Sequence, residues 1–182
     1  MEKVYVFLAD GFEEIEGLTV VDILRRVQVE TVTVSIMGKH TVTGSHGIQV
    51  EADAVFEDVD FEDGTLYVLP GGMPGTKHLG AHEGLRKLLL DSFTAGKRIA
   101  AICAAPSVLG DLGILRGKKA ACYPGFEARL TGAEVTSDQV AVDGTVTTSR
   151  GMGTAIPFAL ALVAQLKDQE TSDELGRAII WS

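Results

Sequence analysis

The sequence predicts an α/β fold in which a mainly parallel sheet is covered by helices on both faces. Short β-prone runs alternate with helix-like segments through the 182 residues, and this alternation is typical of right-handed βαβ units. Aromatic residues make up only 6% of the chain and 21 residues are glycine, which suits aliphatic strands joined by tight turns. Because no linker-like stretch or repeat divides the chain, we expect one domain over residues 1–182.

The first half of the chain predicts three strands and two helices. Residues 4–9 form a continuous β-prone run, and residues 15–26 carry apolar side chains at spacings of three and four, so a strand is followed by a helix. Residues 31–37 predict a second strand, whereas residues 41–54 alternate weakly and predict a hairpin-like excursion. Residues 66–69 predict a short buried strand, followed by a glycine-containing loop and a helix over residues 83–94 that Gly96 caps.

The second half predicts a strand over residues 99–102 and a helix over 104–112, with Pro106 in its first turn, where no intrahelical donor is needed. A short strand over 120–122, a hairpin over 140–148, and helices over 154–165 and 172–180 follow. Ligands of parallel sheets bind beyond the carboxyl ends of the strands. The loops at residues 10–16, 70–75 and 103–106 are therefore expected to share one rim.

Charge and cysteine content exclude several classes of partner. A formal net charge of -9 disfavours binding to nucleic acid, which requires clustered basic side chains. The N-terminal apolar run soon meets acidic residues, unlike a signal peptide or a membrane span. Cys103 and Cys122 have neither a disulfide framework nor the spacing of metal ligands. We therefore expect a cytoplasmic protein that binds no membrane, no metal and no other cofactor.

Cys103 is the first candidate for chemistry, because it lies between a strand and the start of a helix. Unpaired amides of a first helical turn favour an anion, so the thiol there is expected to have a lowered pKa and to form a nucleophilic thiolate. The alternative is a small buried hydrophobic residue. Gly71 and Gly72 follow another strand and would let backbone amides approach a reacting oxyanion. Taken alone, these glycines are better explained as an ordinary tight turn, and they gain significance only beside Cys103.

Glu16 is the second candidate. Glu13 and Glu14 suit the positive end of a helix dipole and need no catalytic role. If the carboxyl group of Glu16 points toward the thiol, poor solvation raises its pKa, and the protonated form can donate a hydrogen bond to the thiolate or move protons.

Several ordered motifs together resemble the ThiJ/PfpI superfamily and, within it, the DJ-one branch. They are VFLADGFEEIE, VVDILRR, YVLPGGMPG, RIAAICAAPSVL and VTTSRGMGTAIPFAL. The resemblance implies a flavodoxin-like three-layer α/β/α sandwich, similar to class I glutamine amidotransferases, and usually a homodimer, for which we consider the helix that carries Val20, Ile23 and Arg26.

For the site, the resemblance implies that Cys103 is the nucleophile and that Glu16 is hydrogen-bonded to its sulfur. It also implies that amides at Gly72 and Ala104 border the oxyanion position. Ala104 stands where the proteolytic branch has a histidine, and Ala101 stands where glutaminases have glycine in a Gly-x-Cys-x-Gly motif. Peptidase and glutaminase activities are therefore disfavoured.

Four further residues are candidates for substrate binding. Tyr123 replaces a histidine of the human-like member and is expected to line the pocket, and His46 corresponds to a basic residue at the pocket mouth. Ser149 and Arg150 precede a predicted helix and would offer an amide and a cation to an anionic ligand, unless they form a plain connecting loop. The other three histidines, His40, His78 and His82, are expected at the surface or in loops.

Two functions are compatible with these residues. One is a cofactor-independent enzyme that converts α-oxoaldehydes to hydroxy acids or acts on glycated adducts, with Cys103 attacking the aldehyde carbon and Glu16 moving a proton. The other is a redox sensor or stress chaperone, in which peroxide oxidises Cys103 and no substrate is turned over. The carbonyl-processing enzyme is the favoured hypothesis.

Overall fold

Strand β1 (Lys3–Leu8) separates the two hydrophobic cores of the molecule, because successive side chains of a strand point to opposite faces of the sheet. Val4 and Val6 lie in the core shared with helices α1 (Glu14–Arg26) and α5 (Ala155–Leu166). Tyr5 and Phe7 lie in the other core, with side chains from α3 (Glu83–Thr94) and α4 (Pro106–Asp111). The computed structural model describes residues 2–181.

The central sheet has seven strands in the order β10-β11-β7-β6-β1-β2-β5. All neighbouring pairs are parallel except the edge pair of β10 and β11. The strands other than β1 span β2 (Glu30–Ser35), β5 (Ala54–Val55), β6 (Leu66–Leu69), β7 (Arg98–Ile102), β10 (Val140–Asp143) and β11 (Val146–Ser149). This order confirms the mainly parallel sheet predicted from the sequence.

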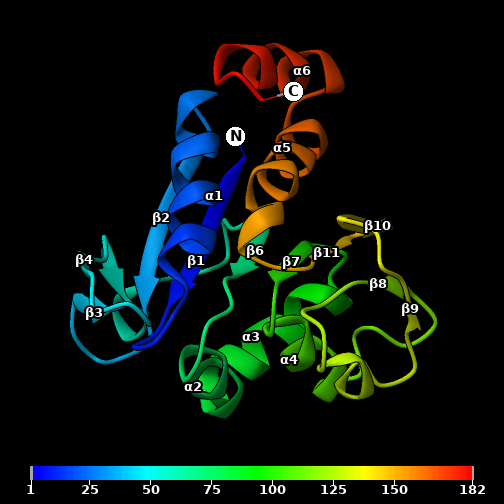
Figure 1. Cartoon of the computed structure of the whole chain (residues 1–182). Coiled ribbons are helices and arrows are strands. Elements are labelled where there is room, and N and C mark those ends of the chain that lie inside the picture. Colours follow the sequence, from blue (N-terminus) through cyan, green and yellow to red (C-terminus); the bar gives the residue numbers. More distant parts are fainter. Residues whose placement is uncertain (1, 182) are drawn as a thin grey trace.

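Two helical layers enclose the sheet and complete a three-layer α/β/α sandwich (Figure 1). Helices α1 and α5 lie side by side on one face, and α6 (Gln169–Ala178) packs against α5. Helices α2 (Gly75–Ala81), α3 and α4 lie on the other face. The predicted flavodoxin-like architecture is confirmed.

Short elements fill the connections between these layers. The expected excursion at residues 41–54 contains the antiparallel hairpin of β3 (Thr41–Thr43) and β4 (Gln49–Glu51), and its last residue starts β5 at the sheet edge. The expected strand at residues 120–122 is the shorter β8 (Lys119–Ala120), which pairs with β9 (Glu134–Val135) outside the central sheet. The 3₁₀ turns are η1 (Phe56–Asp58), η2 (Glu127–Arg129) and η3 (Met152–Thr154).

Helix α2 is the main error of the sequence-based assignment, which placed a loop between residues 70 and 82. Two glycines and a proline give this segment a low helix propensity, so the sequence alone does not predict a helix, but tertiary packing stabilises it. Leu79 is fully buried in the core that contains α3 and α4, and the hydroxyl and amide of Thr76 both donate to the carbonyl of Gly72 at 2.9 Å. The helix therefore fixes the loop that follows β6.

Over residues 2–181, we find no helix that combines the length and apolar character required to cross a membrane.

Candidate active site

Cys103 occupies a sharp turn between β7 and α4, in a conformation that is uncommon for a residue with a side chain. Its φ angle is +65°, in the left-handed region that costs on the order of 1–3 kcal/mol for a non-glycine residue. Backbone hydrogen bonds hold the turn, because the Cys103 amide donates to the carbonyl of Ser149 at 3.0 Å and its carbonyl accepts from the amide of Tyr123 at 2.8 Å. The thiol is half-buried rather than sealed in the core.

Backbone amides from two different loops are directed at the Cys103 sulfur. One belongs to Ala104, next in the chain, and the other belongs to Gly72, in the loop that follows β6. Both hydrogen bonds favour the anionic form of the sulfur. The amides of Ala104 and Gly72 that were expected near residue 103 therefore both interact with its sulfur.

Glu16 reaches the same point from helix α1. It is only 1% exposed, its Oε2 atom accepts a hydrogen bond of 2.8 Å from the amide of Gly71, and its carboxyl group is hydrogen-bonded to the Cys103 side chain. Residues 16, 71 and 103 come from three loops or helix starts at the carboxyl ends of parallel strands. The predicted common rim is thus the place where thiol, carboxyl and amides meet.

Gly71 permits this close approach because it lacks a side chain. A Cβ atom at this position would lie 2.6 Å from the Cβ of Cys103 and 2.7 Å from Oε2 of Glu16. Gly72 has a φ angle of +90°, and a Cβ atom there would lie 2.3 Å from the backbone nitrogen of Glu13. The two glycines therefore serve different purposes: Gly71 makes room for the reactive pair, and Gly72 permits the turn that presents its amide.

Burial changes the titration of both reactive side chains. Desolvation raises the pKa of Glu16 to about 7, although hydrogen bonds from Gly71 and Cys103 act in the opposite direction. Desolvation and the negative charge of Glu16 raise the pKa of the Cys103 thiol to about 12, against the lowering effect of the amides of Ala104 and Gly72. Between about pH 7 and about pH 12, Cys103 and Glu16 therefore retain one proton, which they share across their hydrogen bond.

The lowered thiol pKa that the sequence predicted is not found when Glu16 is ionised. The amides of the helix start lower the pKa of the thiol as expected, but the burial of the thiol and the charge of the adjacent carboxylate, which the sequence does not reveal, outweigh them. The pair can still form a thiolate, because transfer of the shared proton from sulfur to carboxylate leaves an anionic sulfur beside a carboxylic acid. Glu16 is thus in a position to accept the Cys103 proton, at a turn where Ala104 stands in place of the histidine of the proteolytic branch.

Tyr123 is the other expected pocket residue that lies beside Cys103. Its amide bonds to the Cys103 carbonyl, and its side chain is 50% exposed. Gly151 lies against its ring, since a Cβ atom at Gly151 would be 3.3 Å from Cδ2 of Tyr123.

Ser149 and Arg150, which the sequence suggested as substrate-binding residues, differ in their surroundings. The Ser149 side chain is fully buried, donates to the Gln139 carbonyl at 2.6 Å and lies 2.7 Å from the Thr154 hydroxyl. It supports the turn at Cys103 through its backbone carbonyl. Arg150 instead lines a cavity of about 270 Å³ together with Cys122.

Cys122 differs from Cys103 in its surroundings. It is buried, and desolvation raises the pKa of its thiol to about 11, with the Arg150 charge acting in the opposite direction. This agrees with the expected role of Cys122 as a core residue.

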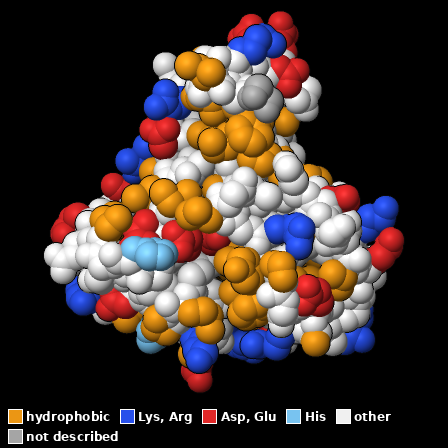
Figure 2. Space-filling view, in the orientation of Figure 1, with side chains coloured by type: hydrophobic (Ala, Val, Ile, Leu, Met, Phe, Trp, Pro, Cys, Tyr) orange, Lys and Arg blue, Asp and Glu red, His pale blue; other side chains and the backbone are white. Residues whose placement is uncertain are grey.

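His46 lies in the turn between β3 and β4 and contacts acidic side chains of helix α1. Its Nδ1 atom lies 3.0 Å from Oε2 of Glu14 and 3.5 Å from Oε2 of Glu13. Hydrogen bonding to Glu14 raises the pKa of the imidazole. Desolvation acts to raise the pKa of Glu14, but hydrogen bonds from its own backbone amide, from His46 and from Ile48 outweigh this effect and lower the pKa to about 2. A histidine side chain is visible beside acidic side chains on this face of the molecule (Figure 2).

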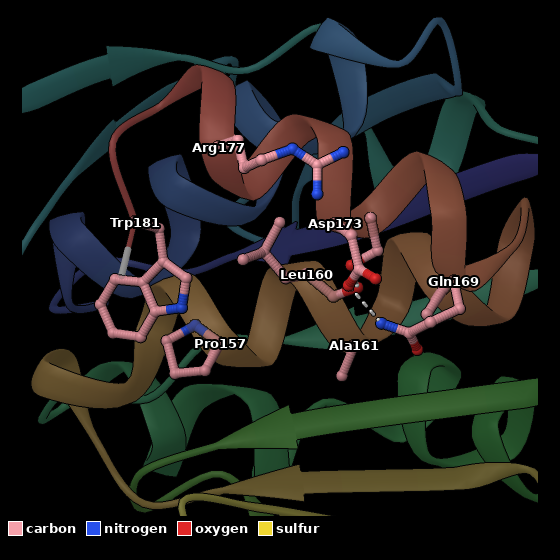
Figure 3. A pocket seen from close by; sticks show the side chains of 9 residues that line it. Pro157, Leu160, Ala161, Gln169, Asp173, Arg177 and Trp181 are labelled. Carbon is pink, nitrogen blue, oxygen red and sulfur yellow. Dashed lines mark hydrogen bonds between the residues drawn. The ribbon is translucent and has the colours of Figure 1, made fainter.

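Another cavity, of about 480 Å³, lies between α5 and α6 (Figure 3). Pro157, Leu160 and Trp181 supply apolar surface to it. Among its polar side chains, Gln169 donates to Asp173 at 2.7 Å. The cavity contains neither cysteine, so the candidate active site remains the half-buried turn at Cys103.

The fold and the site define a class of α/β sandwich proteins with a cysteine at a strand-to-helix turn. Residues 2–165 match the DJ-1/PfpI family, and the chain belongs to this family.

Named relatives extend the match over most of the chain. Protein dj-1beta of Drosophila melanogaster is 34% identical over 177 residues, which cover 96% of this chain and 95% of the relative. Protein DJ-1 homolog B of Arabidopsis thaliana is 36% identical over 98% of this chain, but the match covers only 41% of the plant protein. A Pyrococcus horikoshii relative named as a deglycase is 33% identical over 81% of this chain and 89% of its own length.

Solved structures agree with this assignment. Oxidised DJ-1 of Toxoplasma gondii has a TM-score of 0.96 and 34% identity, and the match covers all of both chains. The crystal structure of DJ-1beta from Drosophila melanogaster has a TM-score of 0.95 and 34% identity, also over both whole chains.

Gly71→Ala tests the close approach of the reactive pair. The added methyl group must displace the Cys103 side chain or the Glu16 carboxylate, so we expect iodoacetamide to alkylate Cys103 about tenfold more slowly, because small displacements of reacting groups have large kinetic effects. Gly80→Ala is the matched control, since its Cβ atom would meet only Val108 Cγ2 at an ordinary 3.5 Å. Equal alkylation rates in the two variants would contradict this account.

The raised pKa of Glu16 predicts a pH-dependent contribution to stability. The folded state retains a proton that the unfolded chain releases near pH 4.5, the ordinary pKa of a glutamate side chain, so between about pH 4.5 and pH 7 the folded state binds more protons. Stability relative to Glu16→Gln is therefore expected to fall as pH rises through this window, by up to about 3 kcal/mol.

Urea unfolding of the wild type and of Glu16→Gln at several pH values in metal-free buffer measures the difference between their free energies of unfolding. Contributions from other titrating groups cancel in this difference. A difference in unfolding free energy that stays constant across the window would show that Glu16 titrates normally.

Proposed function

We propose that this chain is a cofactor-independent enzyme that uses Cys103 to convert small α-oxoaldehydes into 2-hydroxy acids. The observation that carries the proposal is the convergence of a half-buried thiol, a carboxyl group of raised pKa and two free backbone amides at one turn. Two archaeal relatives are named as deglycases, which supports an activity on carbonyl compounds or their glycated adducts.

The first step forms a bond between sulfur and carbon. The Cys103 sulfur adds to the aldehyde carbon while Glu16 accepts the thiol proton, and the carbonyl oxygen becomes the oxyanion of a hemithioacetal. The amides of Ala104 and Gly72 are placed to donate to that oxygen. A carboxyl group with a pKa near the working pH is suited to accept and return a proton in such a step.

The second step moves hydrogen between the two carbons of the substrate. Glu16 first returns its proton to the hemithioacetal oxyanion and then, as a carboxylate, removes the proton from the former aldehyde carbon. It delivers this proton to the neighbouring carbon while the hydroxyl proton passes to the keto oxygen, so the keto group becomes an alcohol and the carbon on sulfur becomes a thioester. Water then hydrolyses the thioester, releasing the hydroxy acid and restoring the thiol. One water is consumed for each aldehyde and no external oxidant or reductant is needed.

A second candidate function is redox sensing or chaperone activity without turnover. It is favoured by the contrast between the half-buried Cys103 and the buried Cys122, because peroxide requires an accessible sulfur. The structural relative from Toxoplasma gondii is described as oxidised. This function requires the Cys103 thiol but no catalytic proton transfer by Glu16. Measuring turnover in the wild type, Cys103→Ala and Glu16→Gln therefore distinguishes it from the enzyme.

Homodimerisation through helix α1 remains part of the proposal. Val20 is fully buried inside its own chain, whereas Ile23 and Arg26 line a groove of about 340 Å³ beside helix α1. Leu18, Asp22, Ile156 and Ile179 also line this groove. Hydrophobic side chains gather on the face formed by α1 and α5 (Figure 2).

Turnover of methylglyoxal to lactate tests the proposed enzyme. Cys103→Ala is expected to reduce the rate to background. Glu16→Gln is expected to lower kcat by about 10²- to 10⁴-fold, the usual contribution of a positioned acid or base. Cys122→Ala is the matched control and is expected to keep its activity, because this thiol lies in a different cavity.

If the wild-type protein forms no lactate, the proposed enzymatic activity is wrong and redox sensing becomes the favoured function. A Cys103→Ala variant as active as wild type would remove both the proposed nucleophile and the mechanism.

A further inference from the structure

Three side chains of metal-ligating type meet outside the active site, at the start of helix α1. Glu13 is the residue that precedes the helix, Glu14 is its first residue, and His46 belongs to the turn between β3 and β4. One ligand atom of each lies within 4.8 Å of the other two. The sequence separation of more than thirty residues between His46 and Glu14 hides this cluster from motif searches.

One of the two distances from His46 falls within the range found around a bound metal ion, and the other is a hydrogen-bonding distance. With zinc bonds of about 2.0–2.2 Å, two ligand atoms of a tetrahedral site lie about 3.3–3.6 Å apart. The Nδ1 atom of His46 lies 3.5 Å from Oε2 of Glu13 and 3.0 Å from Oε2 of Glu14. The Ser45 hydroxyl faces the same point, at 3.1 Å from His46 Nδ1 and 3.3 Å from each of the two carboxylate oxygens.

The most buried ligand is held in place before any ion binds. Glu14 is 3% exposed, and its Oε1 atom accepts hydrogen bonds from the amides of His46 at 2.8 Å and Ile48 at 3.4 Å. Its Oε2 atom is thereby directed at the imidazole. A Cβ atom at Gly44 would lie 2.2 Å from this carboxyl group, so the turn leaves space for the carboxylate only because residue 44 is glycine.

The hairpin that carries His46 is also fixed against the loop before α1. The Ser45 amide donates to the Phe12 carbonyl at 2.8 Å, and the Gly11 amide donates to the Thr43 carbonyl at 2.7 Å. The two halves of the cluster are therefore aligned by backbone hydrogen bonds. Such alignment reduces the ordering that ion binding would otherwise require.

We propose that Glu13, Glu14 and His46 form a binding site for a first-row divalent transition metal ion, with zinc as the best-fitting example. One imidazole nitrogen and two carboxylate oxygens suit such an ion better than magnesium or calcium, which prefer oxygen ligands alone. The His46 side chain is 67% exposed, so the ion can enter from solvent and keep a water ligand. The helix start carries a partial charge of about +0.5, which two carboxylates outweigh.

An ion at this position would join the start of α1 to the β3–β4 hairpin, near the chain segment that carries Glu16. The alternative for the same three residues is an ion pair between His46 and the carboxylates that binds no metal. The two interpretations differ in a measurable property, because only a metal site gives stoichiometric binding that depends on all three side chains. The site shares no residue with the proposed catalytic step, so either proposal can fail alone.

Isothermal titration of the full chain with Zn²⁺ tests the site. We expect one ion per chain in wild type, and binding at least tenfold weaker in His46→Gln and in Glu13→Gln. His78→Gln controls for loss of any histidine, and Cys103→Ala controls for binding to the thiol; both are expected to bind as wild type does. Circular dichroism verifies that each variant is folded.

A second readout uses stability, because an ion that binds only the folded state raises its Tm. Zinc is expected to raise the Tm of wild type and of Cys103→Ala but not of His46→Gln. Loss of binding in Cys103→Ala, with retention in His46→Gln, would assign the ion to the thiol and overturn the proposal. Equal binding by all variants would show adventitious surface binding only and would overturn it as well.

Discussion

The proton shared by Cys103 and Glu16 is the interaction on which the chemistry of this protein depends. Neither group has an ordinary environment: the carboxyl group is buried and the thiol faces both a carboxylate and two backbone amides. Two negative charges in one small buried volume are unfavourable, so the pair retains a proton at neutral pH. In the proposed mechanism, a nucleophile and its base are thereby held in contact without a histidine at this turn.

The fold imposes this contact through backbone geometry. Parallel strands bring the ends of β1, β6 and β7 to one edge of the sheet, so residues far apart in sequence meet there. The left-handed turn at Cys103 and the absence of a side chain at Gly71 then bring sulfur and carboxylate together. The amide of Gly71 bonds to the carboxylate and that of Gly72 to the sulfur. Burial of the ionised Glu16 carboxylate lowers the stability of the folded state. The same carboxylate is the form that can accept the Cys103 proton, so stability and reactivity are opposed at this residue.

The sequence was sufficient for the layers of the fold, because hydrophobic periodicity and strand-to-helix order determine them. The strand-to-helix turn singled out Cys103, and the resemblance to the ThiJ/PfpI superfamily implied that Glu16 is its hydrogen-bond partner. The sequence was insufficient where tertiary packing decides. Helix α2 contains two glycines and is stabilised by packing, Arg150 lies at another cavity, and Ser149 is buried as a structural residue. The direction of the Cys103 pKa shift was missed, because it depends on the distance to a buried charge that no sequence spacing reveals.

The alkylation rate of Cys103 as a function of pH tests the shared proton most directly, measured in wild type and in Glu16→Gln with a chelator present. The account predicts an inflection near pH 7 in wild type, where the pair loses its first proton. Because glutamine cannot share a proton, the inflection is expected to shift by at least about one pH unit in Glu16→Gln. Identical profiles in the two proteins, or a wild-type inflection near about pH 8.5 as in an ordinary thiol, would contradict the account.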